Sequence, residues 1–260
     1  GSESPEQSNL SPIALLSSAS STRNLDAELM RLANSGDAEA MAAVINLSAR
    51  CAQFWSSRGD RYHPKHELAK LPAASSERAT RESALQSLTQ YCDRPYAPGE
   101  VAERVGQFSG RLEELASKGD LVAMAATGFK GQGEVEVLSA MLEADKPWVV
   151  EQAMHAFASG KGQLSRQLDE EVFPFSLRAM PNQLELGKIK SMAARWRACE
   201  LGAACGPNQF EELNQCVLWG NCGLGLGVQA YIRNRELSGY QFELMQRYLA
   251  ALDAKFKGGH

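Results

Sequence analysis

Six cysteines are the residues of this chain best suited to covalent chemistry, and four of them lie close together near the C-terminus. The full set is Cys51, Cys92, Cys199, Cys205, Cys216 and Cys222. An even number with such a cluster predicts a disulfide framework, and disulfides form in an oxidising compartment. Two alternatives remain open, reduced thiols in a cytosolic core and a zinc site. The spacing C-x5-C-x10-C-x5-C lacks the short C-x2-4-C pair that wraps around zinc, so we predict no metal.

The pairing within the cluster is not determined by the sequence, because four cysteines allow three connectivities. The residues Gly206-Pro207-Asn208 could turn one helix into an antiparallel partner. In that geometry Cys199 and Cys216 lie at similar distances from the turn, which favours a bridge between them. Cys205 is then left to pair with Cys222.

Cys51 and Cys92 would close a long loop, for which chain-entropy theory gives about 4 kcal/mol of stabilisation relative to the reduced protein. The segment 56–76 in this loop contains a glycine and two prolines, which predicts an irregular segment with one short helix. Trp55 stands at its base. Because aromatic side chains dominate many protein interfaces, we expect Trp55 and this segment to contact a partner.

Four tryptophans occur in the chain. Trp148 and Trp196 are predicted to fill the core. Trp219 lies between two cysteines, Cys216 and Cys222, and we interpret it as the second interface candidate beside Trp55.

Histidines offer the next candidates for chemistry. The run His63-Pro64-Lys65-His66-Glu67 contains two imidazoles and a carboxylate, which zinc accepts as ligands. Its proline and polar surroundings favour an exposed loop instead. His155 lies beside apolar residues and far in sequence from any cysteine or aspartate that could complete a triad. We therefore predict that His155 is structural or on the surface.

Clustered carboxylates could serve a glycosidase, which needs an acid and a base or nucleophile. The candidates are Asp169-Glu170-Glu171 and Glu113-Glu114, but neighbouring helical residues point in different directions, so solvated faces are predicted. The run Gly223-Leu224-Gly225-Leu226-Gly227 lacks the preceding strand and the Gly-Lys-Ser/Thr ending of a nucleotide loop and is interpreted as a flexible link. We predict no catalytic residue and no cofactor, with a cell-wall hydrolase as an alternative function.

Helices must position these residues, because apolar side chains recur at helical spacing along most of the chain. The predicted helices include 37–55, 77–92, 100–118, 134–144, 164–172, 182–199, 226–237 and 240–256. Alternating runs typical of strands are absent from the sequence. The predicted class is therefore all-α, as an irregular α-solenoid or a helical bundle built from antiparallel helix pairs.

The predicted domain organisation is simple. Residues 1–20 are rich in serine and predict a flexible tether. Residues 21–260 predict a single all-helical domain, which could divide near 175–182, where the helical pattern is interrupted.

One stretch of sequence occurs twice, as LMRLANSGDAEAMAA from Leu29 and as LEELASKGDLVAMAA from Leu112. The shared frame L-x-x-L-A-x-x-G-D-x-x-A-M-A-A predicts a helix that ends at glycine, an aspartate N-cap and a second, alanine-rich helix. This frame resembles half of a SEL-type repeat, a relative of the tetratricopeptide repeat. The copies begin 83 residues apart, whereas tetratricopeptide repeats recur every 34 residues or so. The resemblance implies closely packed antiparallel helices and a protein-binding scaffold.

The charge and composition of the chain limit the classes of partner and the compartments that we expect. The net charge is -4 and basic residues are scattered, which argues against nucleic acid as a partner. No apolar run reaches the roughly 20 residues of a transmembrane helix. Gly1-Ser2 looks like a remnant of tag removal, so any native signal peptide would be missing from this sequence. We expect a periplasmic or secreted monomer, which could be lipid-anchored through a removed N-terminal signal.

These observations lead to one functional hypothesis. We predict a non-enzymatic, protein-binding scaffold of the bacterial envelope with a preformed helical surface. Some exported proteins that the repeat resembles act as immunity partners, which implies an inhibitor of a secreted effector. A cytosolic regulatory adaptor is the alternative if the cysteines are reduced.

Overall fold

The computed structural model describes most of the chain between residues 22 and 256. The described ranges are 22–55, 64–94, 96–128, 134–144, 146–159, 163–179, 182–203, 205–207, 209–220, 222 and 225–256, with Pro12 and Leu16. These ranges contain helices and no strand, which confirms the predicted all-α class. In the same ranges, no helix combines the length and the apolar character that a bilayer crossing requires.

The chain divides into two compact units. Unit 1 comprises Gly1–Lys118 and Gly206–Leu226, and unit 2 comprises Gly119–Cys205 and Gly227–His260. The chain therefore leaves unit 1, returns to it for one short segment, and ends in unit 2. The region 175–182, where a subdivision was expected, lies inside unit 2.

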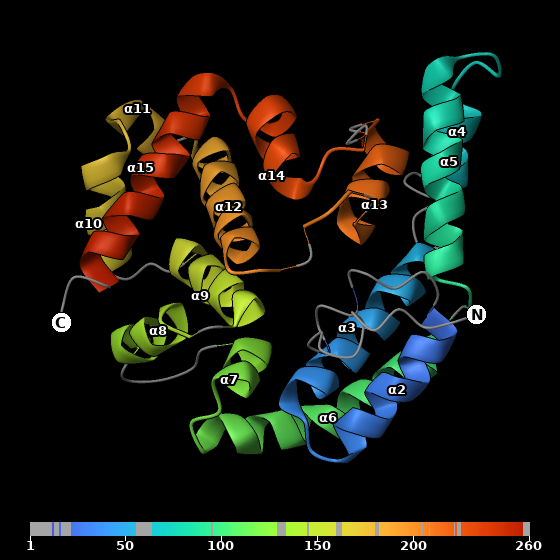
Figure 1. The fold of residues 1–260 in the computed structure, drawn as a ribbon, viewed down its shortest axis with the longest axis horizontal. Helices are drawn as coiled ribbons and strands as arrows, with labels where there is room; N and C mark the ends of the chain where they lie inside the picture. The colour runs from blue at the N-terminus through green and yellow to red at the C-terminus, as the bar shows by residue number, and fades with distance from the viewer. Residues whose placement is uncertain are drawn as a thin grey trace. The chain divides into compact units, whose positions relative to one another are not determined.

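Unit 1 contains two groups of helices (Figure 1), which the Cys51–Cys92 disulfide joins. Its helices are α2 (Thr22–Asn34), α3 (Ala38–Trp55), α4 (Pro64–Ala69), α5 (Ser76–Tyr91), α6 (Pro98–Ser117) and α13 (Phe210–Trp219). Helix α3 packs against α2 and α6, and α13 packs against α5 and α4. Leu16, within the predicted tether, is buried, and its carbonyl accepts a hydrogen bond from the Tyr91 hydroxyl at 2.6 Å. This residue is therefore fixed to unit 1.

Unit 2 is organised around one long helix, α12. Its elements are α7 (Leu121–Thr127), α8 (Glu134–Leu142), α9 (Pro147–Ser159), α10 (Gln163–Val172), α11 (Phe175–Arg178), α12 (Gln183–Glu200), α14 (Val228–Tyr231), the π-helix η3 (Ile232–Glu236) and α15 (Gly239–Phe256). Helix α12 packs against α9, α15, α14 and α11 (Figure 1). Apolar side chains such as Ile189, Met154 and Leu249 fill the space between these helices.

The duplicated motif forms the predicted local structure in both copies. Gly36 and Gly119 have φ values of 104° and 90°, which a glycine adopts without strain. The Asp37 carboxylate accepts a hydrogen bond from the backbone N–H of Ala40 at 2.8 Å, and Asp120 caps α7 in the same way. The first copy lies within unit 1. The second copy carries the chain from unit 1 into unit 2, so the two copies are locally alike but differ in their setting.

All three disulfides form, and their pairing is Cys51–Cys92, Cys199–Cys205 and Cys216–Cys222. The prediction for the first pair is confirmed. The favoured pairing of Cys199 with Cys216 and of Cys205 with Cys222 is wrong. That pairing required α12 and α13 to form a hairpin, but α12 belongs to unit 2 and α13 packs against α5 in unit 1. Each clustered cysteine instead bonds to a neighbour six residues away.

Candidate binding surface

The interface candidate Trp219 is the last residue of α13, and 56% of its surface is exposed. Tryptophan is usually largely buried, since its ring carries a large apolar area. Trp219 also takes part in an interaction within the chain. Tryptophan is enriched among the residues that dominate protein interfaces, so an exposed tryptophan is a candidate anchor.

The backbone around Trp219 is fixed by a turn and a disulfide. Gly220 adopts a left-handed conformation with φ of 74°, and its N–H donates to the carbonyl of Cys216 at 3.0 Å. The Cys222 N–H donates to the carbonyl of Gly220 at 2.8 Å, and the Cys216–Cys222 disulfide closes the same turn. The position of Trp219 is therefore set before any partner arrives.

Arg81 holds the same turn from the neighbouring helix α5. Its buried guanidinium donates through Nε and Nη2 to the carbonyl of Val217 at 3.0 and 2.6 Å, and through Nη2 to that of Leu218 at 3.1 Å. These carbonyls lie in the last turn of α13, where helical partners are missing and a positive charge is favourable. Nη1 pairs with Glu77 at 3.0 Å. Arg81 thus joins α5 to the end of α13.

A groove of about 440 Å³ runs between α5 and α13, on the helix pair that carries Trp219. Its lining comprises Ala79, Thr80, Ser83, Ala84, Ser87, Glu212, Leu213, Cys216, Cys222, Gly225 and Leu226. This volume lies within the range of ligand sites in proteins. We group the groove with Trp219, which ends helix α13, and call these lining residues and Trp219 the α5–α13 face.

Trp55, the other interface candidate, makes two contacts within unit 1. Its indole N–H donates to the carbonyl of Cys92 at 2.8 Å, and its ring meets Phe54 edge to face. The side chain is half-buried. The short helix expected within 56–76 is present as α4, whereas residues 56–63 lie outside the described part of the chain.

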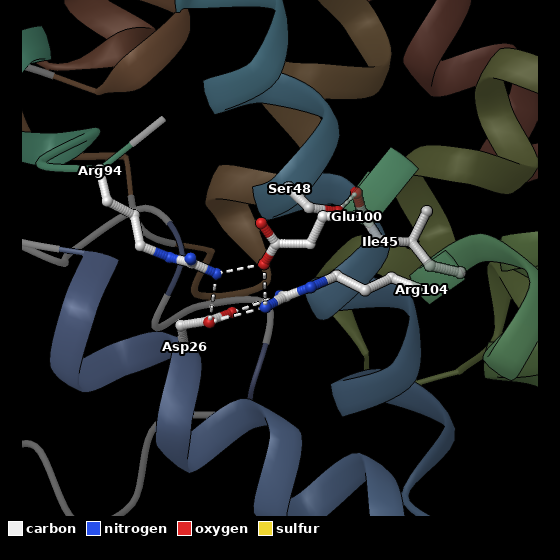
Figure 2. Close-up of polar contacts among 6 residues, drawn as sticks. All are labelled: Asp26, Ile45, Ser48, Arg94, Glu100 and Arg104. Carbon is white, nitrogen blue, oxygen red and sulfur yellow. Dashed lines mark hydrogen bonds and ion pairs between the residues drawn. The ribbon is translucent and has the colours of Figure 1, made fainter. Parts of the chain in front are cut away.

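A buried ion cluster in unit 1 was not found by sequence reasoning (Figure 2). The Arg104 guanidinium faces both oxygens of Asp26, with Nη2 at 2.8 Å from Oδ2, and also contacts Glu100 at 3.1 Å. Arg94 reaches Asp26 at 3.3 Å and pairs closely with Glu100. Tyr96 lies beside both guanidiniums, with ring centroid distances of 4.2 Å to Arg94 and 4.9 Å to Arg104. The cluster joins α2, α6 and the segment between α5 and α6.

The electrostatics of this cluster indicate a structural role. Burial alone would raise the pKa of Asp26, but the hydrogen bonds and charges of Arg104 and Arg94 hold it below its usual value. Burial and the nearby Asp26 charge raise the pKa of Tyr96 to about 12. Two arginines and two carboxylates compensate one another in this cluster, and the lowered pKa keeps Asp26 ionised. A ligand is not required to balance these charges.

Unit 2 contains a simpler buried pair. The Lys190 ammonium lies 2.6 Å from the Asp169 carboxylate and 5.8 Å from the ring centroid of Tyr248. Here burial outweighs the lysine, and the pKa of Asp169 is raised. Burial and the Asp169 charge also raise the pKa of Tyr248. Asp169 is therefore half-buried and paired with Lys190, unlike the solvated carboxylate expected from the sequence.

The remaining sequence candidates lie apart from the α5–α13 face. His155 is half-buried on α9 and lies 3.8 Å from Glu151. Burial would raise the pKa of Glu151, but hydrogen bonds from His155 and Arg195 and their charges hold it below its usual value. Four of the proposed glycosidase carboxylates, Glu113, Glu114, Glu170 and Glu171, are exposed or half-exposed.

His63 of the histidine run and residues 223 and 224 of the glycine run lie outside the described part of the chain. His66 is exposed. No group of three metal-ligating side chains gathers at a metal-binding distance anywhere within the described part of the chain.

Unit 2 has exposed apolar side chains of its own. Phe175, Leu184 and Tyr240 are 74%, 88% and 58% exposed. A hydrogen bond of 2.6 Å from Gln241 to Glu185 holds the start of α15 beside the start of α12 (Figure 1). These three side chains lie at the beginnings of their helices, whereas Trp219 lies on a helix pair that also forms a groove. The α5–α13 face is therefore the stronger candidate.

Comparisons with known proteins found no match for this chain among family models, curated proteins or solved structures. The resemblance of the duplicated motif to SEL-type repeats therefore stays a prediction from the sequence.

Proposed function

We propose that this chain is a non-enzymatic, protein-binding module that contacts its partner through the α5–α13 face. The observation that carries the proposal is Trp219, which is exposed and yet held by Arg81, Gly220 and a disulfide. Tryptophan is among the residues that contribute most to binding at protein interfaces. A preformed anchor loses little conformational freedom on binding, so more of its contact energy appears as affinity.

The three disulfides support a place of action outside the cytosol. We propose the bacterial periplasm or the secreted fraction. Within that setting, the resemblance to exported SEL-type proteins supports an inhibitor or immunity-type partner of a secreted effector. The partner would then be a protein that meets this chain after export.

The place of action is tested first. Intact mass is measured under non-reducing conditions, with and without alkylation, on protein recovered from its native host. A mass lower by six hydrogens and no alkylation is the expected result, because three disulfides consume six thiols. Six alkylated thiols would contradict an exported protein and would make a cytosolic adaptor the better hypothesis.

The binding face is tested by photo-crosslinking in the native host. A photoreactive phenylalanine analogue replaces Thr80, which lines the groove, or Thr89, which is exposed on α5 outside the groove. We expect a protein adduct from position 80 and none from position 89, and we expect Trp219→Ala to reduce the adduct at least tenfold, since truncating an anchor costs about 2 kcal/mol or more. Equal adducts from both positions, or none from either, would contradict the proposal.

A further inference from the structure

The three disulfides differ in how easily a second molecule can open them. A thiolate opens a disulfide by attacking one sulfur while the other sulfur leaves with the negative charge. A buried sulfur is out of reach for the attack and is a poor place for the charge. Cys51 and Cys92 are both fully buried, and Cys216, the partner of the half-buried Cys222, is buried as well. Neither of these bridges meets both conditions.

Cys199–Cys205 is the bridge in which both residues are half-buried. Cys199 lies in the last turn of α12, where carbonyl groups without helical partners disfavour a negative charge. Cys205 lies beyond the end of that helix. The favoured direction is therefore an attack on the sulfur of Cys199, with Cys205 as the leaving thiolate.

The place of this bridge in the fold gives its opening a consequence. Cys205 is the last residue of unit 2 before the chain enters unit 1 for the segment Gly206–Leu226, which contains α13. The chain re-enters unit 2 at Gly227, and the N–H of Val228 donates to the carbonyl of Cys205 at 2.9 Å. Cys205 thus joins the two ends of the segment, and the disulfide fastens them to α12.

We propose that Cys199–Cys205 is a thiol–disulfide exchange site for a protein dithiol of the C-x-x-C class, and that its opening releases the ends of the segment Gly206–Leu226 from α12. A thiolate of the dithiol bonds to the Cys199 sulfur as the Cys199–Cys205 bond breaks, and Cys205 leaves with the electron pair and takes a proton from water. The second thiol of the reductant then loses its proton to water and attacks the sulfur bound to Cys199, which leaves as a thiolate and is protonated. The chain gains two electrons and two protons, and the reductant becomes a disulfide.

The exchange leaves the α5–α13 face in place. The Cys216–Cys222 bridge and the hydrogen bonds of Arg81 hold α13 within unit 1 without any contribution from Cys199 or Cys205. The Cys199–Cys205 bridge is closed at rest and opens only with a dithiol. The partner of the proposed binding face plays no part in this exchange.

The probe is reduced thioredoxin, a dithiol protein with a C-x-x-C motif, added in equimolar amount to the oxidised full chain. Samples are quenched with acid and alkylated, and mass spectrometry assigns each new thiol to its residue. We expect Cys199 and Cys205 to be alkylated about tenfold faster than the other four cysteines, because only their bridge meets both conditions for exchange. A first reaction at another bridge, or equal rates at all three, would overturn the proposed site.

A second measurement tests the release of the segment. In the double variant Cys199→Ser, Cys205→Ser, amide hydrogen exchange at Val228 should be about tenfold faster than in the oxidised wild type, because its acceptor carbonyl is no longer held to α12. The double variant Cys216→Ser, Cys222→Ser removes a bridge with the same sequence separation of 6 and should leave Val228 unchanged.

Circular dichroism verifies that both double variants fold, and wild type treated with thioredoxin gives the same comparison without a substitution. Unchanged exchange at Val228 after loss of the Cys199–Cys205 bridge would overturn the proposed release.

Discussion

Each unit buries an aspartate against a cationic side chain, yet the pKa values of the two carboxyls are displaced in opposite directions. In unit 1 the pKa of Asp26 is lowered, and in unit 2 the pKa of Asp169 is raised. Burial raises the pKa in both cases. The pKa of Asp26 is nevertheless lowered, because one guanidinium contacts both of its carboxylate oxygens and a second guanidinium adds its charge. Asp169 has a single compact ammonium as its close partner.

The comparison shows that burial alone does not decide the direction in which the pKa of a carboxyl is displaced. Planar guanidiniums match a carboxylate in two places at once, whereas an ammonium acts as a point charge. Unit 1 contains a second buried guanidinium with several partners, since Arg81 donates to the backbone carbonyls of Val217 and Leu218 at the end of α13. Unit 1 therefore joins distant helices through buried arginines, and this is the unit that carries the α5–α13 face.

The largest expected effect comes from breaking the unit 1 cluster with Arg104→Met. Asp26 would then stay buried with only Arg94 as a cationic partner, and loss of one member of a buried pair lowers stability by about 3 kcal/mol. Urea denaturation of the oxidised protein at neutral pH measures this change. Arg166→Met, at an exposed position on α10, is the control and should stay within about 0.5 kcal/mol. A loss below about 1 kcal/mol for Arg104→Met would show that Arg94 alone suffices.

The unit 2 pair should respond differently, because it can be removed as a whole. Lys190→Met alone leaves Asp169 without its partner and should lower the free energy of unfolding by about 2 kcal/mol. Adding Asp169→Leu should recover most of that loss, since an isolated buried pair is often replaced by apolar residues without harm. Urea denaturation of both variants measures how much of the lost free energy of unfolding the second substitution restores. If the double variant is as unstable as the single one, Asp169 supports the core through contacts other than Lys190.

The opposite pKa displacements predict opposite pH dependence. Asp26 has a lowered pKa in the folded state, so its contribution is present above its unfolded pKa and is lost as the pH falls through the folded pKa. Asp169 has a raised pKa, so it favours folding most below its unfolded pKa, and that contribution is lost as the pH rises through the folded pKa. A tenfold difference in proton affinity between the folded and unfolded states corresponds to about 1.4 kcal/mol of stability.

Asparagine variants separate the two contributions. The stability difference between wild type and Asp26→Asn should shrink as the pH falls from neutral to about 3, a range that spans the usual titration of aspartate. Over the same fall in pH, the free energy of unfolding of wild type should rise relative to that of Asp169→Asn. Denaturation at each pH, with carboxyl pKa values measured by NMR, provides the check. Equal slopes for the two variants would contradict the comparison.

The smallest effect is expected at the exposed pair of Glu28 and Arg31, one helical turn apart on α2. Water and salt screen such a pair, so Glu28→Gln should cause no measurable change in the denaturation midpoint. A clear drop of the denaturation midpoint would mean that exposed and buried ion pairs contribute equally to stability, which would contradict the comparison.

The sequence by itself determined the parts of this protein that depend on neighbouring residues. Helical spacing located most of the helices, and the Gly36-Asp37 and Gly119-Asp120 pairs predicted two helix boundaries. These features are local because a cap bonds to a backbone group three residues away. The number of cysteines predicted a disulfide framework, and the position of Trp219 beside the clustered cysteines pointed to an exposed side chain.

Only the tertiary structure decided which distant segments meet. Arg81 bonds to a carbonyl 136 residues away, and Arg104 bonds to a carboxylate 78 residues away. No spacing rule connects such positions. The pairing of Cys199 and Cys216 was wrong for the same reason, since a local turn does not reveal that α13 packs against α5 in unit 1 while α12 belongs to unit 2. These arginine and aspartate side chains become buried only when the distant segments come together, and burial is what gives them a structural role.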